Sequence, residues 1–143
     1  MQNKTSDIKV AVDAIVFGYS KKEGVSLLLI QRKYEPHKNS WALPGGFVLA
    51  DESLETAVIR ELQEETGITV NYLEQLYSFG EPDRDPRQRV ISIAYFGLVK
   101  TSQFRELKAS TDAENAAWFS IKKLPALAFD HKQIIRQAVE RLQ

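Results

Sequence analysis

The sequence predicts one layered domain of the α/β or α+β class, in which two helices cover a sheet. Three observations indicate this class. Segments rich in valine and isoleucine flank an amphipathic helix at residues 54–66, and a second helix is expected after Asp130. No linker, repeat or low-complexity tract divides residues 1–143. With 43% hydrophobic residues, a chain of this length can bury a core of its own.

The composition excludes several classes of protein. Nineteen basic and nineteen acidic side chains balance, which argues against a dedicated nucleic-acid surface. There is no cysteine, so disulfides and thiolate zinc sites are excluded. No apolar run reaches membrane-spanning length, and the polar start at Met1–Asp7 does not resemble a signal peptide. We therefore expect a cytoplasmic protein with no membrane partner.

The first part of the chain predicts a hairpin followed by an irregular approach to the central helix. Residues Ile8–Phe17 and Val25–Gln31 are expected to be strands joined by a polar turn, and the second is apolar enough for burial on both faces. A polar loop follows at Tyr34–Ser40. Because Pro44 cannot donate to a ladder, Trp41–Pro44 is expected to be an edge or irregular strand.

Beyond the central helix the pattern predicts five segments: an extended stretch at 69–80, a charged loop at 81–88, a strand at 89–100, a polar excursion at 101–115 and a short strand at 116–121. Asp130 and Gln133 then form a predicted capping box for the last helix. Trp41, Asp130 and His131 are expected to have structural roles, Trp41 because large aromatic side chains are usually core residues.

The central helix carries the informative pattern. Ser53 is placed to cap its first turn, and Gly67 to end it in the left-handed conformation. At about 100° per residue, Glu61, Glu64 and Glu65 lie on the apolar side of the helix. Their spacings of three and four residues allow all three side chains to converge on one point.

Converging carboxylates repel one another, and a divalent cation is the simplest compensation. Hard oxygen ligands suit magnesium or manganese. The alternative is a solvated acidic helix face. Arg60 stands four residues before Glu64 and can orient it, and Glu52 is a second expected partner of Arg60. Gly45 and Gly46 allow a close approach of the backbone, so that a main-chain carbonyl can join the metal shell.

These residues resemble a known sequence motif. Gly46, Glu52 and the run Arg60–Ile68, separated by five and then seven residues, match the Nudix box at every defined position. The chain therefore resembles the Nudix hydrolase family over nearly its whole length. In that family the box forms a loop–helix–loop that holds metal ions against a pyrophosphate. The resemblance implies an alpha-beta-alpha sandwich around a mixed β-sheet.

The resemblance also implies roles for the box residues. The expected cofactor is Mg²⁺ or Mn²⁺, held mainly by Glu61 and Glu65 with help from Glu64 and the Gly45 carbonyl. The expected catalytic group consists of Glu64, Glu65, Arg60 and Glu52. One of the glutamates is expected to deprotonate the attacking water, but family members differ in which residue does so. Asp112 and Glu114 are alternative bases, unless they are solvated loop carboxylates.

The stretch 79–92 resembles the equivalent part of ADP-ribose pyrophosphatases and of the Nudix-related transcriptional regulators of NAD metabolism. Pro82 and Pro86 bracket the position where a proline accompanies ADP-ribose activity. The tyrosine expected there in dinucleoside polyphosphate hydrolases is missing. The resemblance thus points to a small-molecule nucleotide substrate with a diphosphate linkage.

Five residues are candidate substrate contacts. Arg84, Arg87 and Arg89 offer forked donors to phosphate or ribose oxygens, and Arg32 ends the second predicted strand as a further phosphate contact. Phe79 is expected to stack on an adenine. The alternative for the arginines is that they pair with the acidic residues of the same loop.

Three functions are compared. The first is metal-dependent hydrolysis of ADP-ribose to AMP and ribose 5-phosphate. The second is an ADP-ribose-sensing module without catalysis, and the third is a nucleoside triphosphate pyrophosphohydrolase of the sanitising type. The box is intact, the balanced charge shows no basic excess, and the chain stops at Gln143 with no room for a DNA-binding region. These features favour the enzyme, and the resemblance admits a homodimer.

Overall fold

The structure is a computed structural model that describes residues 7–104, 107 and 113–143, with the backbone alone at 113 and 114. Within these residues, seven strands form one sheet: β1 (Lys9–Ser20), β2 (Gly24–Arg32), β3 (Trp41–Ala42), β4 (Gly45–Phe47), β5 (Glu74–Phe79), β6 (Val90–Lys100) and β7 (Ala113–Ser120). The helices are α1 (Leu54–Thr66) and α2 (His131–Leu142), with a 3-10 turn at Thr101–Gln103. No helix in the described ranges is both long and apolar enough to cross a bilayer.

The sheet is mixed, as the family resemblance implies. Its main path runs β3–β2–β1–β6–β5, while β4 also pairs with β1 and β7 with β2. The β1–β6 pair is parallel from Lys9↔Val90 to Tyr19↔Lys100, and the other pairs are antiparallel. Strand β1 extends past the predicted end at Phe17, because its ladders with β2 and β6 continue there.

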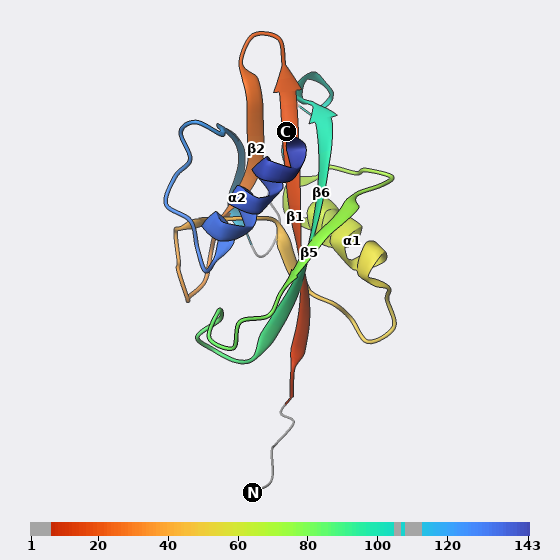
Figure 1. The fold of residues 1–143 in the computed structure, drawn as a ribbon, viewed down its shortest axis with the longest axis vertical. Coiled ribbons are helices and arrows are strands. Elements are labelled where there is room, and N and C mark those ends of the chain that lie inside the picture. Colours follow the sequence, from red (N-terminus) through yellow and green to blue (C-terminus); the bar gives the residue numbers. More distant parts are fainter. Residues whose placement is uncertain (1–6, 105–106, 108–112) are drawn as a thin grey trace, which may run out of the picture.

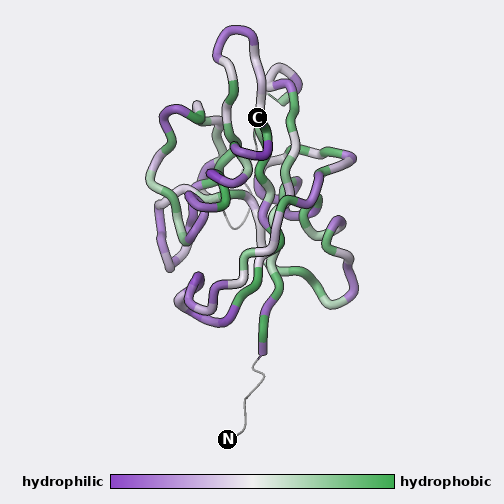
Figure 2. Tube along the Cα trace, viewed as in Figure 1, coloured by the Kyte–Doolittle hydropathy of each residue, from purple (hydrophilic) through white to green (hydrophobic). Residues whose placement is uncertain are grey.

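The two helices cover opposite faces of this sheet, which confirms the predicted sandwich (Figure 1). Successive side chains of a strand point to opposite faces. Val12, Ala14 and Val16 accordingly pack with the core under α1, and Ile15 and Phe17 pack with the core under α2. This double burial makes β1 the central strand. Figure 2 shows hydrophobic colour along the central strands and hydrophilic colour at turns.

The ends of α1 follow the prediction, and the start of α2 does not. The Ser53 side chain accepts a hydrogen bond from the Thr56 amide, and Gly67 takes a left-handed conformation with φ 81°. Asp130 makes no side-chain bond to the first turn of α2, so the predicted capping box is wrong. Its carboxylate is bound instead by Arg84, a charged donor that outcompetes a backbone amide.

The other predicted segments hold with changed boundaries. The extended stretch after α1 contains a strand only at β5, and the last strand is longer than predicted because β7 pairs along β2. Residues 81–88 form a loop, as expected. Pro44 lies between the short strands β3 and β4, and its carbonyl accepts from Ala14. This irregular segment delivers Gly45 and Gly46 to the N-terminal half of β1.

Candidate functional site

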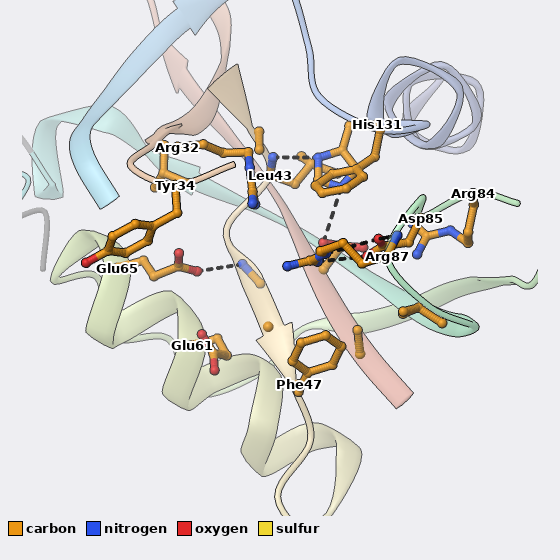
Figure 3. Close-up of a pocket in the computed structure, with 18 of the residues that line it drawn as sticks. Arg32, Tyr34, Leu43, Phe47, Glu61, Glu65, Arg84, Asp85, Arg87 and His131 are labelled. Carbon is orange, nitrogen blue, oxygen red and sulfur yellow. Dashed lines mark hydrogen bonds and ion pairs between the residues drawn. The ribbon is translucent and has the colours of Figure 1, made fainter. Parts of the chain in front are cut away.

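A pocket of about 430 Å³ opens between α1, β4, the end of β2, the 81–88 loop and the start of α2. Of the predicted site residues it brings together six: Gly45, Glu61, Glu65, Arg32, Arg84 and Arg87. Glu52, Arg60, Glu64, Phe79 and Arg89 are not among its lining residues. Two charged walls face this pocket (Figure 3). We call Glu61 and Glu65 with Gly45 the carboxylate wall, and Arg32, Arg84 and Arg87 the arginine wall.

The carboxylate wall is built by the close approach of β4 to α1. Glu65 is 5% exposed, and its Oε1 accepts from the Gly45 amide at 2.7 Å. A Cβ atom on Gly46 would lie 2.6 Å from the carboxyl carbon of Glu61, so a side chain there would displace the Glu61 carboxylate. The predicted close approach of the backbone to the helix at Gly45 and Gly46 is therefore confirmed. Two carboxylates are thereby held one helical turn apart against the backbone of β4.

Arg60 ties the outer side of α1 to the preceding loop. It donates to both oxygens of Glu52 at 2.6 and 2.9 Å, to Glu61 at 2.8 Å and to Glu64 at 3.3 Å. A fifth bond reaches the Phe47 carbonyl at 3.2 Å. Hydrogen bonds from Arg60 are the largest cause that lowers the pKa of Glu52, to about 2. The predicted Arg60 partners, Glu52 and Glu64, are confirmed. Through the bonds of Arg60 to Glu52 and Phe47, α1 is held against the end of β4.

The three glutamates do not converge on one point, which corrects the expectation from helix geometry. The Glu64 side chain is 51% exposed and bonds Arg60, outside the pocket lining. Within the described part of the chain, no group of three or more acidic, histidine or cysteine side chains is arranged to hold a metal ion. Glu61, Glu65 and the nearby Gly45 backbone still present hard oxygen atoms, a donor set that fits Mg²⁺ or Mn²⁺.

Arg32 differs from the other cations of the arginine wall. Its Nε donates to the Pro36 carbonyl at 2.8 Å, and its guanidinium lies 4.8 Å from the centre of the Phe129 ring. Burial first, and then the charge of Arg87, lower the pKa of Arg32, while nearby carboxylates including that of Glu65 oppose this. Figure 3 shows Arg32, Glu65 and Arg87 pointing toward one space. An anion bound there would stabilise the Arg32 charge.

The arginines of the loop are already bound to acidic groups. Arg87 bonds Asp85 at 2.8 and 3.1 Å, which confirms the alternative of pairing within the loop for this residue. Arg84 is 6% exposed and holds Asp130 through two bonds of 2.7 and 2.9 Å. Arg89 donates to the Glu81 carbonyl at 3.3 Å, away from the pocket lining. The loop is thus nearly neutral by itself.

Phe129, together with Tyr34 and Phe47, lines the pocket, and Phe79 does not. The predicted stacking of Phe79 on an adenine is wrong, because this ring is 7% exposed within the core under α2. Trp41 is also part of that core and packs edge-to-face on Phe119. Phe129 lies between Arg32 and Arg87, with φ 51°. No local sequence pattern marks Phe129, because its neighbours in the pocket are distant in the chain.

Sequence reasoning also missed the floor of the pocket, where Asp13 meets His131. The His131 Nδ1 accepts from the buried Leu43 amide at 3.0 Å, and its Nε2 lies 3.6 Å from Asp13 Oδ1. The Ser92 hydroxyl donates to the other Asp13 oxygen. Burial is the main cause that lowers the pKa of His131. An aspartate inside the apolar strand at 8–17 was the one signal available in the sequence.

The alternative bases cannot be placed. Asp112 and the side chain of Glu114 lie outside the described residues.

Comparison with known proteins gives a consistent result. The family profile described as NUDIX domain matches residues 7–142. The chain is 46% identical, over 89% of its length and 70% of the relative's, to an ADP-ribose pyrophosphatase of Methanocaldococcus jannaschii. It is 36% identical to the ADPR responsive transcriptional repressor NtrR of Acinetobacter baylyi, covering 93% of the chain but about half, 54%, of that relative.

Two solved structures are similar throughout the chain. The NUDIX domain of Shewanella oneidensis NrtR complexed with ADP ribose superimposes with a TM-score of 0.89 and 34% identity, covering 97% of this chain and 91% of that one. A bifunctional NMN adenylyltransferase/ADP ribose pyrophosphatase of Francisella tularensis, complexed with AMP and a manganese ion, gives 0.85 and 32%, covering 99% of this chain and 44% of that one.

Proposed function

Because the chain belongs to the Nudix family and is a Nudix hydrolase, we propose that its pocket hydrolyses the pyrophosphate bond of ADP-ribose, releasing AMP and ribose 5-phosphate. The observation that carries this proposal is the position of Arg32 opposite Glu61 and Glu65 across one 430 Å³ pocket. The charges of a diphosphate suit this space, since one wall is anionic and the other presents the partly buried guanidinium of Arg32. The 46% identity to an ADP-ribose pyrophosphatase supports the choice of substrate.

In this proposal Glu61 and Glu65 would hold Mg²⁺ or Mn²⁺, with the Gly45 carbonyl as a further ligand. Glu64 would join them only by turning away from Arg60. When bound, such a cation neutralises phosphate charge and lowers the pKa of a bound water. The family and the manganese ion in the Francisella structure support this cofactor.

The residues of the chain supply position and proton transfer. The Gly45 amide fixes Glu65 through Oε1, and Arg60 fixes Glu61, Glu64 and Glu52. The proton of the attacking water passes to a carboxylate oxygen of Glu64 or Glu65. Arg32 binds the diphosphate from the other side and stabilises the charge that develops on the leaving phosphate.

The balance of charges in the pocket favours a diphosphate ester over a triphosphate. The lining carries four basic and five acidic side chains, and Arg84 and Arg87 are each held by a carboxylate. A nucleoside triphosphate is more negative than ADP-ribose and would need further cations. Apart from Lys33, the described lining offers no basic side chain beyond the three arginines, so triphosphates are proposed to be poor substrates.

Sensing of ADP-ribose without cleavage is the second candidate, and the 36% identity to a repressor favours it. A protein of this kind would bind ADP-ribose in the same pocket. The complete glutamate set and the Arg60 network argue for catalysis, because binding alone does not require Glu64.

A substrate panel with Mg²⁺ tests the proposal. ADP-ribose and several nucleoside triphosphates are incubated with the protein, and products are resolved by ion-exchange chromatography. We expect AMP and ribose 5-phosphate from ADP-ribose. The Glu65→Gln variant serves as a control for contaminating hydrolases. Turnover of triphosphates but not ADP-ribose would identify the sanitising type, and tight binding of ADP-ribose with no product would identify the sensor.

A further inference from the structure

The short segment Phe129–His131, at the start of α2, contacts both walls of the pocket. Asp130 binds Arg84, which lies 46 positions earlier in the chain, and His131 binds Leu43, which lies 88 positions earlier. Two adjacent residues therefore connect two segments that are distant from each other in the sequence. The Asp130 side chain does not serve to start the helix, because it forms no side-chain cap.

The His131 ring is held in one protonation state and one tautomer. It is 5% exposed, and burial lowers its pKa, which favours the neutral ring. Because Nδ1 accepts from the Leu43 amide at 3.0 Å, the proton of the neutral ring lies on Nε2. Nε2 in turn faces Asp13 Oδ1 at 3.6 Å, and the other Asp13 oxygen accepts from Ser92. Hydrogen bonds at both ends of this buried chain, from the Leu43 amide and from the Ser92 hydroxyl, fix its geometry.

Leu43 connects this buried chain to the carboxylate wall. It stands two residues before Gly45, whose amide donates to Glu65 at 2.7 Å. Asp13 also lies directly against Gly45, because a Cβ atom on Gly45 would lie 2.6 Å from Asp13 Oδ1. His131 and Asp13 thus stand behind the backbone that orients Glu65. A shift of Leu43 would move the Gly45 amide and, with it, the Glu65 carboxylate.

Asp130 acts on the opposite wall. Its two oxygens take a forked pair of bonds from Arg84, a geometry that fixes orientation as well as distance. Arg84 belongs to the 81–88 loop, which also carries the pocket residues Asp85 and Arg87. Figure 3 shows His131 beside the loop that carries Arg84, Asp85 and Arg87. The loop is thereby fixed to the same end of α2 as the segment that carries Gly45.

We propose that Asp130 and His131 are positioning residues that join the two walls of the pocket: His131 holds Leu43–Gly45 behind Glu65, and Asp130 holds the arginine-bearing loop. This inference rests on the proposed function for its kinetic consequences. Because Glu65 belongs to the chemistry and the loop to substrate binding, His131 governs kcat, whereas Asp130 governs KM.

The test of His131 uses two side chains that separate its two contacts. In His131→Asn, Oδ1 stands as many bonds from the backbone as the histidine Nδ1 and can accept from Leu43. In His131→Gln, the amide group reaches the place of Nε2 instead, and the Leu43 amide loses its acceptor. We expect His131→Gln to lower kcat at least about tenfold with KM nearly unchanged, because small misplacements of reacting groups are costly. His131→Asn is expected to restore most of kcat.

A second readout does not depend on the substrate. In ¹⁵N-labelled protein, hydrogen exchange of the Leu43 and Gly45 amides is followed by NMR. Both amides are expected to lose protection in His131→Gln and to keep it in His131→Asn, while the Ala57 amide in α1 stays protected in both. Ile135→Val, a change in the apolar face of α2, is the control for general loosening and is expected to leave both amides protected.

The test of Asp130 uses Asp130→Asn, which weakens the forked bond to Arg84. We expect KM for ADP-ribose to rise several-fold with kcat nearly unchanged. If His131→Gln and His131→Asn behave alike in both exchange and kcat, or if Ile135→Val matches them, the positioning role of His131 is wrong. If Asp130→Asn lowers kcat by as large a factor as it raises KM, the assignment of kcat to one wall and KM to the other is wrong. If the wild type cleaves no ADP-ribose, the proposed function fails, and exchange at Leu43 and Gly45 still decides the role of His131.

Discussion

The two walls of the pocket carry charge in opposite ways. In the arginine wall, Arg84 and Arg87 are each bound by a carboxylate. In the carboxylate wall, Glu61 and Glu65 stand one helical turn apart on a buried side of α1. The difference teaches that the charges of Arg84 and Arg87 are compensated within the fold, whereas the proposed cation would further stabilise the carboxylate wall. Reactivity is therefore expected to depend most on the carboxylate wall, and the predictions below follow that order.

The largest effect is expected at Glu65. Glu65→Gln keeps the size of the side chain and removes its charge, so turnover of ADP-ribose should fall by about 10²–10⁴-fold, the range for a lost proton-transfer group. Because the repulsion with Glu61 is relieved, the melting temperature should not fall. Steady-state kinetics and thermal unfolding measure the two effects. Near-normal turnover would remove Glu65 from the catalytic group.

Glu64→Gln separates the half-exposed neighbour from the buried one. The structure places Glu64 on Arg60 and outside the pocket lining, so we expect a loss near about 10²-fold, at the low end of the same range. The same assay applies, with Glu55→Gln in the first turn of α1 as a matched control of unchanged rate. A larger loss than in Glu65→Gln would identify Glu64 as the principal base.

The arginine wall is tested by Arg32→Ala. One hydrogen bond to a charged group contributes about 1.5–3 kcal/mol, so KM should rise at least about tenfold while kcat changes less. Arg89→Ala is the matched control, since Arg89 lies away from the pocket lining and should leave KM unchanged. Equal effects in the two variants would show that Arg32 is not a specific phosphate contact.

The smallest effect is a pH dependence of stability that arises behind the carboxylate wall. Burial lowers the pKa of His131 below its ordinary value of 6.5. Between the two values the unfolded chain binds a proton that the folded protein excludes, so the free energy of unfolding falls as pH falls below about 6.5. Urea unfolding at several pH values measures this slope. It should be weaker in His131→Asn, and an unchanged slope would assign it to other groups.

Much of the fold followed from local patterns. Ser53, Gly67 and the alternating apolar residues of β1 act on their immediate neighbours, so the sequence was sufficient to place α1 and the two-sided sheet. The family motif added the mixed sheet. The predicted capping box at the start of α2 was wrong for the opposite reason. The partner of the Asp130 carboxylate is Arg84, and no local rule reports a contact across 46 residues.

The site was predicted only in part, because several of its contacts join residues that no local pattern relates. Helix geometry placed Glu61 and Glu65 on one wall, but it could not show that Arg60 draws Glu64 outward. The expected stacking of Phe79 failed because burial within the core under α2 depends on packing between distant segments.

The central claim is that the carboxylate wall is completed by a divalent cation. Crystals grown with Mn²⁺ and AMP test it most directly, through anomalous scattering measured at the manganese edge. We predict an anomalous peak bound by Glu61 and Glu65, and its loss in Glu65→Gln crystals prepared in the same way. A wild-type pocket that holds AMP but shows no anomalous peak at these two carboxylates would contradict the account.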